Sequence, residues 1–389
     1  MSAELGAAEA SLQTASEAPE LHGQYLAKPS YTFLQSINEG AAGECYRYRH
    51  EVFEHDVVAK TVALFGIPGS LTEPQLLKNL KHDNLLTVRE AQWTPDMDPA
   101  LKVVTFTTDY CEGQSVFTAL EEGHVFSIRE AVTICSQVLA ALDYMHLDHE
   151  LLHRDVKPGN VMLDGSRTTG FLGDLGSVAA LTDGSSPAGA GTLAYLPPES
   201  AAGELHPCSD VYSTGMVLIE MLNGPYDWES VDEAKMEANV DSSKRALPQK
   251  FYKLAPWVPP AVATVARAMT DPDPGRRPGS AAEARRRLDD ARYVDWSRVD
   301  GTGLLGVWEG TWPPGARARQ LRTVRITAAP VEKGRYAGQV KLQASWRGPG
   351  PGTWRRYARL DRRVARGDSA ALARFFRVVE EAAQAAPVR

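Results

Sequence analysis

The sequence predicts an α+β chain with two lobes, the first rich in β-strands and the second α-helical, followed by a small β-rich domain with a C-terminal helix. Apolar and polar residues alternate in short segments over residues 30–112, which is typical of strands. Over residues 113–292 apolar residues recur at helical spacing, and strand-like segments return over 293–389. At 389 residues the chain has ample length for these units.

The first lobe is predicted element by element. Strands are expected where β-branched and aromatic residues alternate with polar ones, at 31–37, 45–50, 57–64 and 101–110. The segment EPQLLKNL, residues 73–80, is expected to be helical, because Thr72 is a suitable N-cap and proline stands in the first turn. Residues 1–29 are rich in Ala, Glu and Ser and are expected to be a disordered leader.

The second lobe and the C-terminal domain follow in the same way. Long helices are expected at 127–148 and 209–222, and the last helix of the lobe ends near residue 291. In the C-terminal domain we expect strands at 306–312, 321–331, 334–347 and 353–360, and a helix at 369–386.

Composition limits the function classes. The net charge of -7 and the pI near 5.8 give no general reason to expect nucleic acid as a partner. Residues 296–389 hold eighteen Lys or Arg against seven Asp or Glu, so this part is strongly basic and the rest is acidic. Four isolated cysteines without a CxxC pair argue against a zinc site or disulfides. Without an apolar run of about 18 residues or a secretory signal, we expect a cytoplasmic protein with no membrane contact.

The C-terminal domain carries four tryptophans among its arginines, Trp308, Trp312, Trp346 and Trp354. Interleaved aromatic and cationic residues can bind nucleic acid or an acidic partner. We favour the alternative in which the tryptophans fill the domain's core and the arginines are solvated, so nucleic acid is not expected. A third alternative is that this basic domain binds the acidic lobes themselves.

The stretch HRDVKPGN, residues 153–160, places an aspartate, a lysine and an asparagine within a few positions. DLG follows at 174–176, a lysine closes the strand VVAK at residue 60, and the glycine-containing turn NEGAAGEC lies before it at 38–45. In this order the motifs resemble the protein kinase family, specifically bacterial Ser/Thr kinases of eukaryotic-like type. The resemblance covers about two thirds of the chain and implies a bilobal protein-kinase fold.

The resemblance also implies roles for these residues. Phosphoryl transfer depends mostly on positioning and charge neutralisation. Asp155 would accept the proton of the substrate hydroxyl, and Lys157 would reach the γ-phosphate of ATP. Asn160 and Asp174 would hold Mg²⁺ or Mn²⁺.

The resemblance also assigns residues to nucleotide binding. Lys60 would grip the α- and β-phosphates and pair with Glu73, which stands near the start of the expected helix. The residues implied in ATP binding are Asn38, Gly40, Gly43, Cys45, Val58, Lys60, Thr108, Asp109, Cys111 and Met162.

A second group of motifs implies a peptide-substrate platform. GTLAYLPPE, residues 191–199, resembles the end of the family's activation segment, where Glu199 would pair with Arg277. Asp210 would brace the catalytic loop, and Thr192 would bond Asp155.

Arg154 precedes the catalytic aspartate, as in kinases whose activation segment is ordered by phosphorylation. We therefore expect autophosphorylation at Thr182, Ser185 or Ser186, the alternative being a loop that merely contains serines.

The predicted function is that of an ATP- and Mg²⁺-dependent serine/threonine protein kinase acting on protein hydroxyl groups. One alternative is a nucleotide-binding pseudokinase that acts as a scaffold, although every acid, amide and lysine position is filled. Another is a small-molecule kinase, which would have no use for GTLAYLPPE and its arginine partner.

Overall fold

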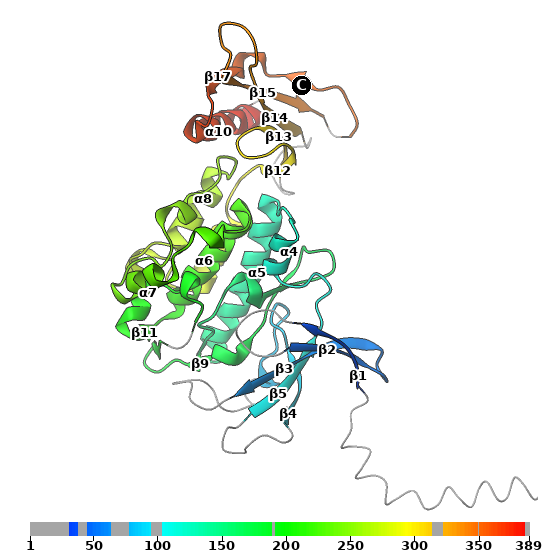
Figure 1. Cartoon of the computed structure of the whole chain (residues 1–389), viewed down its shortest axis with the longest axis vertical. Coiled ribbons are helices and arrows are strands. Elements are labelled where there is room, and N and C mark those ends of the chain that lie inside the picture. Colours follow the sequence, from blue (N-terminus) through cyan, green and yellow to red (C-terminus); the bar gives the residue numbers. More distant parts are fainter. Residues whose placement is uncertain are drawn as a thin grey trace, which may run out of the picture.

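The computed structural model describes residues 31–37, 45–63, 78–94, 103–188, 191–312, 322–348 and 350–385. It confirms the predicted architecture: a β-rich lobe, a helical lobe, and a C-terminal sheet with a final helix, arranged in that order along the molecule (Figure 1). Among the described helices, none combines the length and apolarity that a membrane span requires.

The first lobe is one antiparallel sheet with the strand order β1-β2-β3-β5-β4. Its strands are β1 (Tyr31–Ile37), β2 (Cys45–His50), β3 (His55–Ala63), β4 (Val88–Trp93) and β5 (Val103–Asp109). In β3 the buried residues Val57 and Ala59 alternate with Val58 and Lys60, which therefore share the opposite face. Strand β4 was not predicted; of its six residues only Val88 is buried, so it lacks an apolar pattern. Of the predicted helix at 73–80, only residues 78–80 are described, and 78 and 79 are helical.

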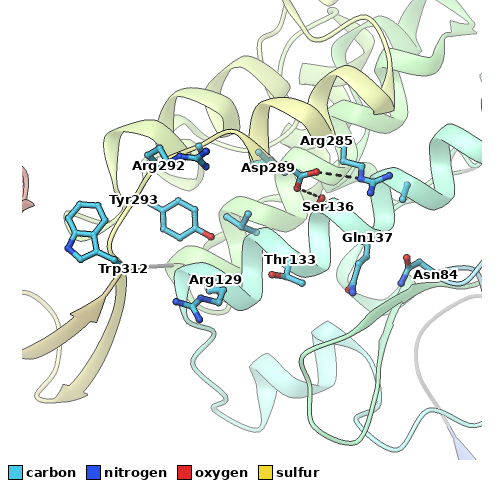
Figure 2. A pocket seen from close by; sticks show the side chains of 14 residues that line it. Asn84, Arg129, Thr133, Ser136, Gln137, Arg285, Asp289, Arg292, Tyr293 and Trp312 are labelled. Atoms are coloured by element: carbon cyan, nitrogen blue, oxygen red, sulfur yellow. Dashed lines mark hydrogen bonds and ion pairs between the residues drawn. The ribbon is translucent and has the colours of Figure 1, made fainter. Parts of the chain in front are cut away.

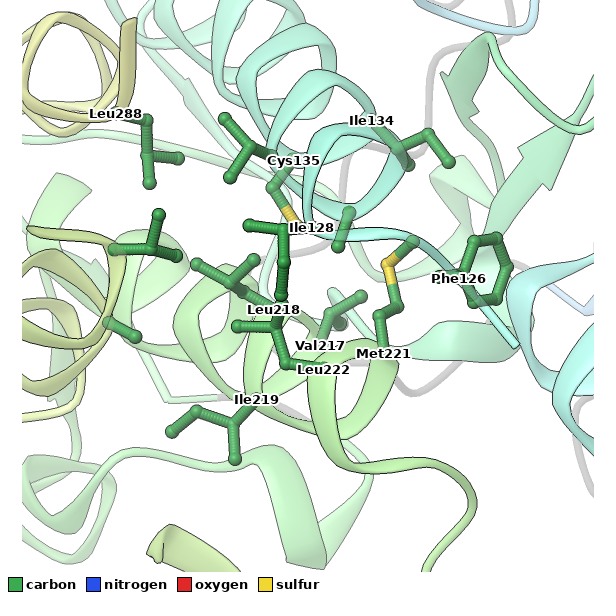
Figure 3. Close-up of a cluster of buried hydrophobic side chains, with 14 of the residues drawn as sticks. Phe126, Ile128, Ile134, Cys135, Val217, Leu218, Ile219, Met221, Leu222 and Leu288 are labelled. Carbon is green, nitrogen blue, oxygen red and sulfur yellow. The ribbon is translucent and has the colours of Figure 1, made fainter. Parts of the chain in front are cut away.

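The second lobe is helical. Its helices are α4 (Val116–Glu121), α5 (Ile128–Asp148), α6 (Pro207–Asn223), α7 (Glu233–Asp241), α8 (Pro260–Met269) and α9 (Ala281–Asp289). Helix α5 begins at a capping box in which Ser127 and Glu130 satisfy each other's backbone N–H groups. Side chains of α5, α6 and α9 form the buried core of this lobe, as Figure 3 shows for Cys135, Leu218 and Leu288.

Short two-stranded pairs accompany the helices of this lobe. They are β6 (Leu151–Leu152) with β9 (Ala179–Ala180), β7 (Val161–Leu163) with β8 (Gly170–Leu172), and β10 (Ser186–Pro187) with β11 (Glu204–Leu205). Gly113 permits the segment after β5 to come close to the end of β7, because a Cβ there would lie 2.0 Å from the carbonyl oxygen of Asp164.

The C-terminal domain is a six-stranded antiparallel sheet covered on one side by α10 (Ser369–Ala385). Its strands are β12 (Asp295–Asp300), β13 (Gly306–Thr311), β14 (Thr323–Pro330), β15 (Gln339–Arg347), β16 (Arg355–Arg356) and β17 (Arg362–Ala365). Strand β12 was not predicted, and the strand predicted at 353–360 is reduced to β16, because Tyr357 and the residues after it turn away to reach β17.

The tryptophans of this domain divide into two groups. Trp308 is fully buried and packs on Phe376 of α10, and Trp312 is half-buried against the same core, as the core alternative predicted. Trp346 and Trp354 are only half-buried, and arginines stack on them, so for these two the core alternative is wrong. Trp354 lies against Arg325 and Arg347, on the side of the sheet away from α10, and Trp346 is the last residue but one of β15.

The C-terminal domain packs directly on the helical lobe. The guanidinium of Arg298 lies over the rings of both Trp257 and Trp308, at 4.4 and 5.1 Å from their centroids. Asp295 accepts the backbone N–H of Arg129 and pairs with its side chain. The lobe, which is acidic overall, supplies the cation of this pair, and the basic C-terminal domain supplies the anion.

A groove of about 410 Å³ lies beside the Arg129–Asp295 pair and reaches from Trp312 to α9 (Figure 2).

Candidate active site

A cleft of about 630 Å³ lies between the β-rich and helical lobes. It is lined by all the described residues that the resemblance assigns to ATP and metal binding: Cys45, Val58, Lys60, Thr108, Asp109, Cys111, Asn160, Met162 and Asp174. Asn38, Gly40, Gly43 and Glu73 lie outside the described residues. These residues are spread over more than a hundred positions of the sequence, so it is the tertiary fold that brings them into one site.

The apolar walls of the cleft come from both lobes. Val58 and Cys45 belong to neighbouring strands of the sheet, and Met162 lies in β7 of the helical lobe. Burial, followed by the nearby carboxylate of Asp109, raises the pKa of the Cys111 thiol to about 11. This thiol therefore stays protonated near neutral pH and acts as an apolar hinge residue.

Lys60 and Asp174 form an ion pair across the cleft, with Nζ and Oδ1 2.7 Å apart. Burial would raise the pKa of Asp174, but the charge and hydrogen bond of Lys60 outweigh it, and the pKa is lowered from its ordinary value. Asp174 has a left-handed backbone, with φ 56°, and its side chain accepts the N–H of Gly176. The carboxylate is thus held charged and fixed in direction.

Asp155 lies at the centre of a hydrogen-bond network. Its Oδ1 accepts both the backbone N–H and the hydroxyl of Thr192, each at 2.9 Å. Its Oδ2 is 2.9 Å from Nζ of Lys157, which also donates to the Thr192 hydroxyl at 2.8 Å. Thr192, some 37 positions away in sequence, therefore connects the catalytic loop to the activation segment as the resemblance implied.

Asn160 and Asp174 offer oxygen ligands suited to a hard divalent cation. The amide nitrogen of Asn160 donates to the carbonyl and to Oδ2 of Asp155, at 2.7 and 3.0 Å, which fixes the amide oxygen as the outward acceptor. Mg²⁺ in nucleotide sites is held by one or two side-chain oxygens together with phosphates and waters. One carboxylate and one amide oxygen fit that requirement.

A buried carboxylate holds the catalytic loop in shape. Asp210 accepts the backbone N–H groups of His153 and Arg154 at 2.9 Å each, and Nε2 of His146 lies 2.8 Å from it. Burial would raise the pKa of Asp210, but the hydrogen bonds and positive potential of its histidine neighbours lower it instead. The left-handed backbone of Arg154, with φ 67°, is stabilised by this bracing.

The activation segment is joined to the catalytic loop by Arg154. Its guanidinium donates to the backbone carbonyls of Ser177 and Pro187, at 2.6 and 2.9 Å. Arg154 therefore holds the segment at its start and again near its middle. Ser186 is fully buried in the β10–β11 pair, because its backbone pairs with Leu205.

The predicted pair between Glu199 and Arg277 is confirmed. Two parallel hydrogen bonds of 2.7 Å join the guanidinium to both carboxylate oxygens, and the Arg277 side chain is 0% exposed. The guanidinium also lies over the ring of Tyr212. This pair fixes the end of the activation segment on the helical lobe.

The cleft extends beyond the residues that were predicted. Leu193, Tyr195, Trp228, Glu233 and Met236 line its far end. Tyr195 donates to the buried Glu220 at 2.7 Å, which holds it against α6. No local motif distinguishes Trp228 or Met236 from ordinary core residues, so only the folding of α7 and of the turn before it toward the cleft assigns them here.

Comparison with known proteins agrees with this geometry. The family model described as "Protein kinase domain" matches residues 31–287. The chain is 28% identical over 261 residues to striated muscle preferentially expressed protein kinase of Danio rerio, covering 66% of this chain and 8% of that protein. It is 27% identical over 261 residues to serine/threonine-protein kinase PrkC of Bacillus subtilis, covering 64% and 38%. Probable serine/threonine-protein kinase WNK9 of Oryza sativa subsp. japonica is 29% identical over 185 residues, covering 47% and 43%. The chain spans less than half the length of each of these relatives.

Proposed function

Because the chain belongs to the protein kinase family, we propose that it is an active serine/threonine protein kinase that transfers the γ-phosphate of ATP to protein hydroxyl groups. The observation that carries this proposal is the network in which Thr192 joins Asp155 and Lys157. It holds a carboxylate and an ammonium together beside a nucleotide-sized cleft, which is the arrangement that phosphoryl transfer needs.

In this proposal Asp155 orients the substrate hydroxyl and accepts its proton. Four donor groups from three residues contact the carboxylate and keep it in one rotamer, so the position of the base is set before the substrate arrives. Lys157 offsets negative charge on the transferred group. The hydroxyl attacks phosphorus, the bond to the β-phosphate oxygen breaks, and ADP leaves with the negative charge.

Lys60 holds the α- and β-phosphates, exchanging its contact with Asp174 for contacts with the nucleotide. Asn160 and Asp174 would hold Mg²⁺ or Mn²⁺, which neutralises the phosphate charge when bound. Whether Glu73 also pairs with Lys60 stays a prediction from the sequence. Thr108, Asp109 and Cys111 form the hinge against which the adenine is proposed to bind.

A nucleotide-binding pseudokinase scaffold is the second candidate. Such a protein would keep the nucleotide cleft but would not transfer a phosphoryl group. The filled positions 60, 155, 160 and 174 favour the enzyme.

A radiolabel assay on a generic basic protein separates the two. We expect transfer from ATP by the wild-type chain and a loss of about 10² to 10⁴-fold in Asp155→Asn, because the amide cannot accept the proton. Asp148→Asn, at the exposed end of α5, is the matched control and should keep full activity. A wild-type protein that leaves the terminal phosphate of ATP untouched, or an Asp155→Asn variant of normal activity, would contradict the proposal.

We further propose autophosphorylation of the activation segment. Thr182 is exposed and Ser185 half-exposed, so these two are the favoured acceptors, and Ser186 would have to leave its buried position first. Phosphopeptide mapping of wild-type and Asp155→Asn protein tests this. Absence of phosphate on all three residues in active wild-type protein would end the idea.

The remaining proposals concern the setting of the enzyme. Its substrates are proposed to be proteins with Ser or Thr acceptors. None of the described cysteines forms a disulfide bond, which is consistent with the reducing cytoplasm predicted from the sequence. The basic C-terminal domain is proposed to bind an acidic partner, in addition to its contacts with the kinase lobe.

A further inference from the structure

We propose that the C-terminal sheet binds a carboxylate-rich segment of a partner protein on its open face. The open face is the side of the sheet opposite α10, and it carries Arg325, Lys341, Arg347, Arg356 and Arg363. This inference goes beyond phosphoryl transfer and does not depend on it, because the surface belongs to a different domain from the cleft.

The sheet has two chemically distinct sides. In β14 the buried residues Val324, Ile326 and Ala328 face α10, and Thr323, Arg325 and Thr327 alternate with them on the other side. Strand β15 repeats the alternation, with its apolar residues buried in the same core. The register between the strands therefore aligns the cationic residues on one continuous face.

Positive charge exceeds negative charge on the open face. Over β14 to β17 five cations stand against the two carboxylates that contact them: Glu309, which contacts Arg325 and Arg347, and Asp361, which contacts Arg356. The register puts the other acids of this face, Asp295 and Asp300, on the distant edge strand β12. Two acids do not balance five cations, so this part of the face keeps a net positive charge.

At the other end of the face, like charges are neighbours. Lys341 and Arg363 stand directly opposite each other in the β15–β17 register. Like charges in this position destabilise a sheet unless an anion lies between them. A bound carboxylate would convert this repulsion into attraction.

The aromatic residues favour a polypeptide over nucleic acid. The guanidinium carbons of Arg325 and Arg347 lie 4.0 and 4.7 Å from the centroid of the Trp354 ring. Arg363 lies 4.4 Å from the centroid of Tyr336. Single-stranded nucleic acid binds by stacking bases on free aromatic rings, and these rings are already covered by arginines. What the face offers instead is guanidinium edges, which suit carboxylates.

The spacing of the charges predicts the form of the ligand. Ser345 stands opposite Arg356, and Lys341 stands opposite Arg363, so the two cationic ends are four residues apart along β15. That is about 14 Å, which an extended chain spans with about four residues. The amide of Gln343 lies between the ends. We therefore expect acidic residues about four positions apart in an extended segment.

A binding assay on the full chain tests the proposal, with a labelled oligoglutamate peptide and fluorescence anisotropy. We expect Arg325→Glu/Arg347→Glu to weaken binding by about tenfold or more, equivalent to about 1.4 kcal/mol. The matched control is Arg374→Glu/Arg377→Glu, which makes the same charge change at exposed positions of α10, on the other side of the domain. It should weaken binding by less than about twofold. Equal losses in both variants, or no loss in the first, would overturn the proposal.

A second variant and a second probe separate the remaining explanations. Lys341→Glu/Arg363→Glu tests the other end of the face and leaves the Glu309 contacts intact, should the first variant fail to fold. If a labelled oligothymidylate binds more tightly than the peptide and the peptide fails to displace it, the ligand class is wrong. Phosphoryl transfer to a generic protein should be unchanged in every variant, so loss of peptide binding and failure of the kinase proposal are separate outcomes.

Discussion

The ammonium of Lys60 lies 2.7 Å from the carboxylate of Asp174, and this ion pair joins the β-rich lobe to the helical lobe inside the cleft. Lys60 belongs to β3, and Asp174 follows β8 by two residues. Each side chain is mostly shielded from solvent, so each depends on the other for charge compensation.

Lys60→Met is therefore expected to destabilise the fold by about 2 kcal/mol, because it leaves the Asp174 carboxylate poorly solvated and without its partner. Urea unfolding measures this. Adding Asp174→Asn to Lys60→Met should recover most of the loss.

The same pair has a defined pH dependence. The folded-state pKa of Asp174 is lowered, so the pair's contribution is present above the ordinary aspartate pKa and is lost as the pH falls through the lowered value. The stability difference between wild type and Lys60→Met should shrink in that acidic range. A difference that grows on acidification would contradict the assignment.

Arg277→Met is expected to cost about 3 to 5 kcal/mol, because it leaves Glu199 without the two hydrogen bonds that compensate its burial. The neighbouring Arg276→Met removes an exposed pair with Asp273 and should cost less than about 1 kcal/mol. Thermal or urea unfolding of the two variants makes the comparison. Similar losses in both would show that the Glu199 pair adds little.

Ser186→Ala is expected to leave stability unchanged or raise it slightly, since the Ser186 hydroxyl is buried without a hydrogen-bond partner among the described residues. Ser186→Asp should lower both stability and activity, because it places a charge in the β10–β11 pair. Thr182→Asp, at an exposed position, is the control and should not unfold the segment. A well-folded Ser186→Asp protein of full stability would disagree with the burial of this residue.

Glu380→Gln is expected to stabilise the C-terminal domain at pH 8 by up to about 3 kcal/mol. Burial raises the pKa of Glu380 to about 7, although Trp296 Nε1 donates to it at 2.7 Å. Because the folded-state pKa lies above the unfolded one, the wild type loses stability as the pH rises from about 4.5 to about 7. Glutamine still accepts the indole N–H and carries no charge.

Melting curves at pH 5 and pH 8 test this prediction. The advantage of Glu380→Gln should be large at pH 8 and small at pH 5. An advantage independent of pH would mean that the carboxyl is already ionised in the folded protein at both values.

Local patterns predicted the long helices and most strands of the two sheets, but missed α4, α7, α8, β4, β12 and the short strand pairs. Helix α5 was predicted almost to the residue, because its N-cap and its helical repeat are both local signals. Strand β4 carries no clear alternation and exists because β5 pairs with it. The strand predicted at 353–360 was too long because the return of the chain to β17 overrides the propensity of its residues.

The same division holds for the candidate site. The motifs at 153–160 and 174–176 were recognisable because their chemistry requires fixed residue types at short spacing. Trp228 and Met236 were missed because an aromatic or apolar side chain has the same sequence signal in a cleft wall as in a core.

The sequence by itself determined the order of the lobes, the residue types of the catalytic loop and the opposite charges of the two halves, because these depend on residue identity and short spacing. Tertiary structure decided which charges meet: Lys60 with Asp174, Arg154 with backbone carbonyls, and arginines with Trp354 on one face of a sheet. Such contacts depend on strand register and lobe packing, which place residues far apart in the chain within a few ångströms.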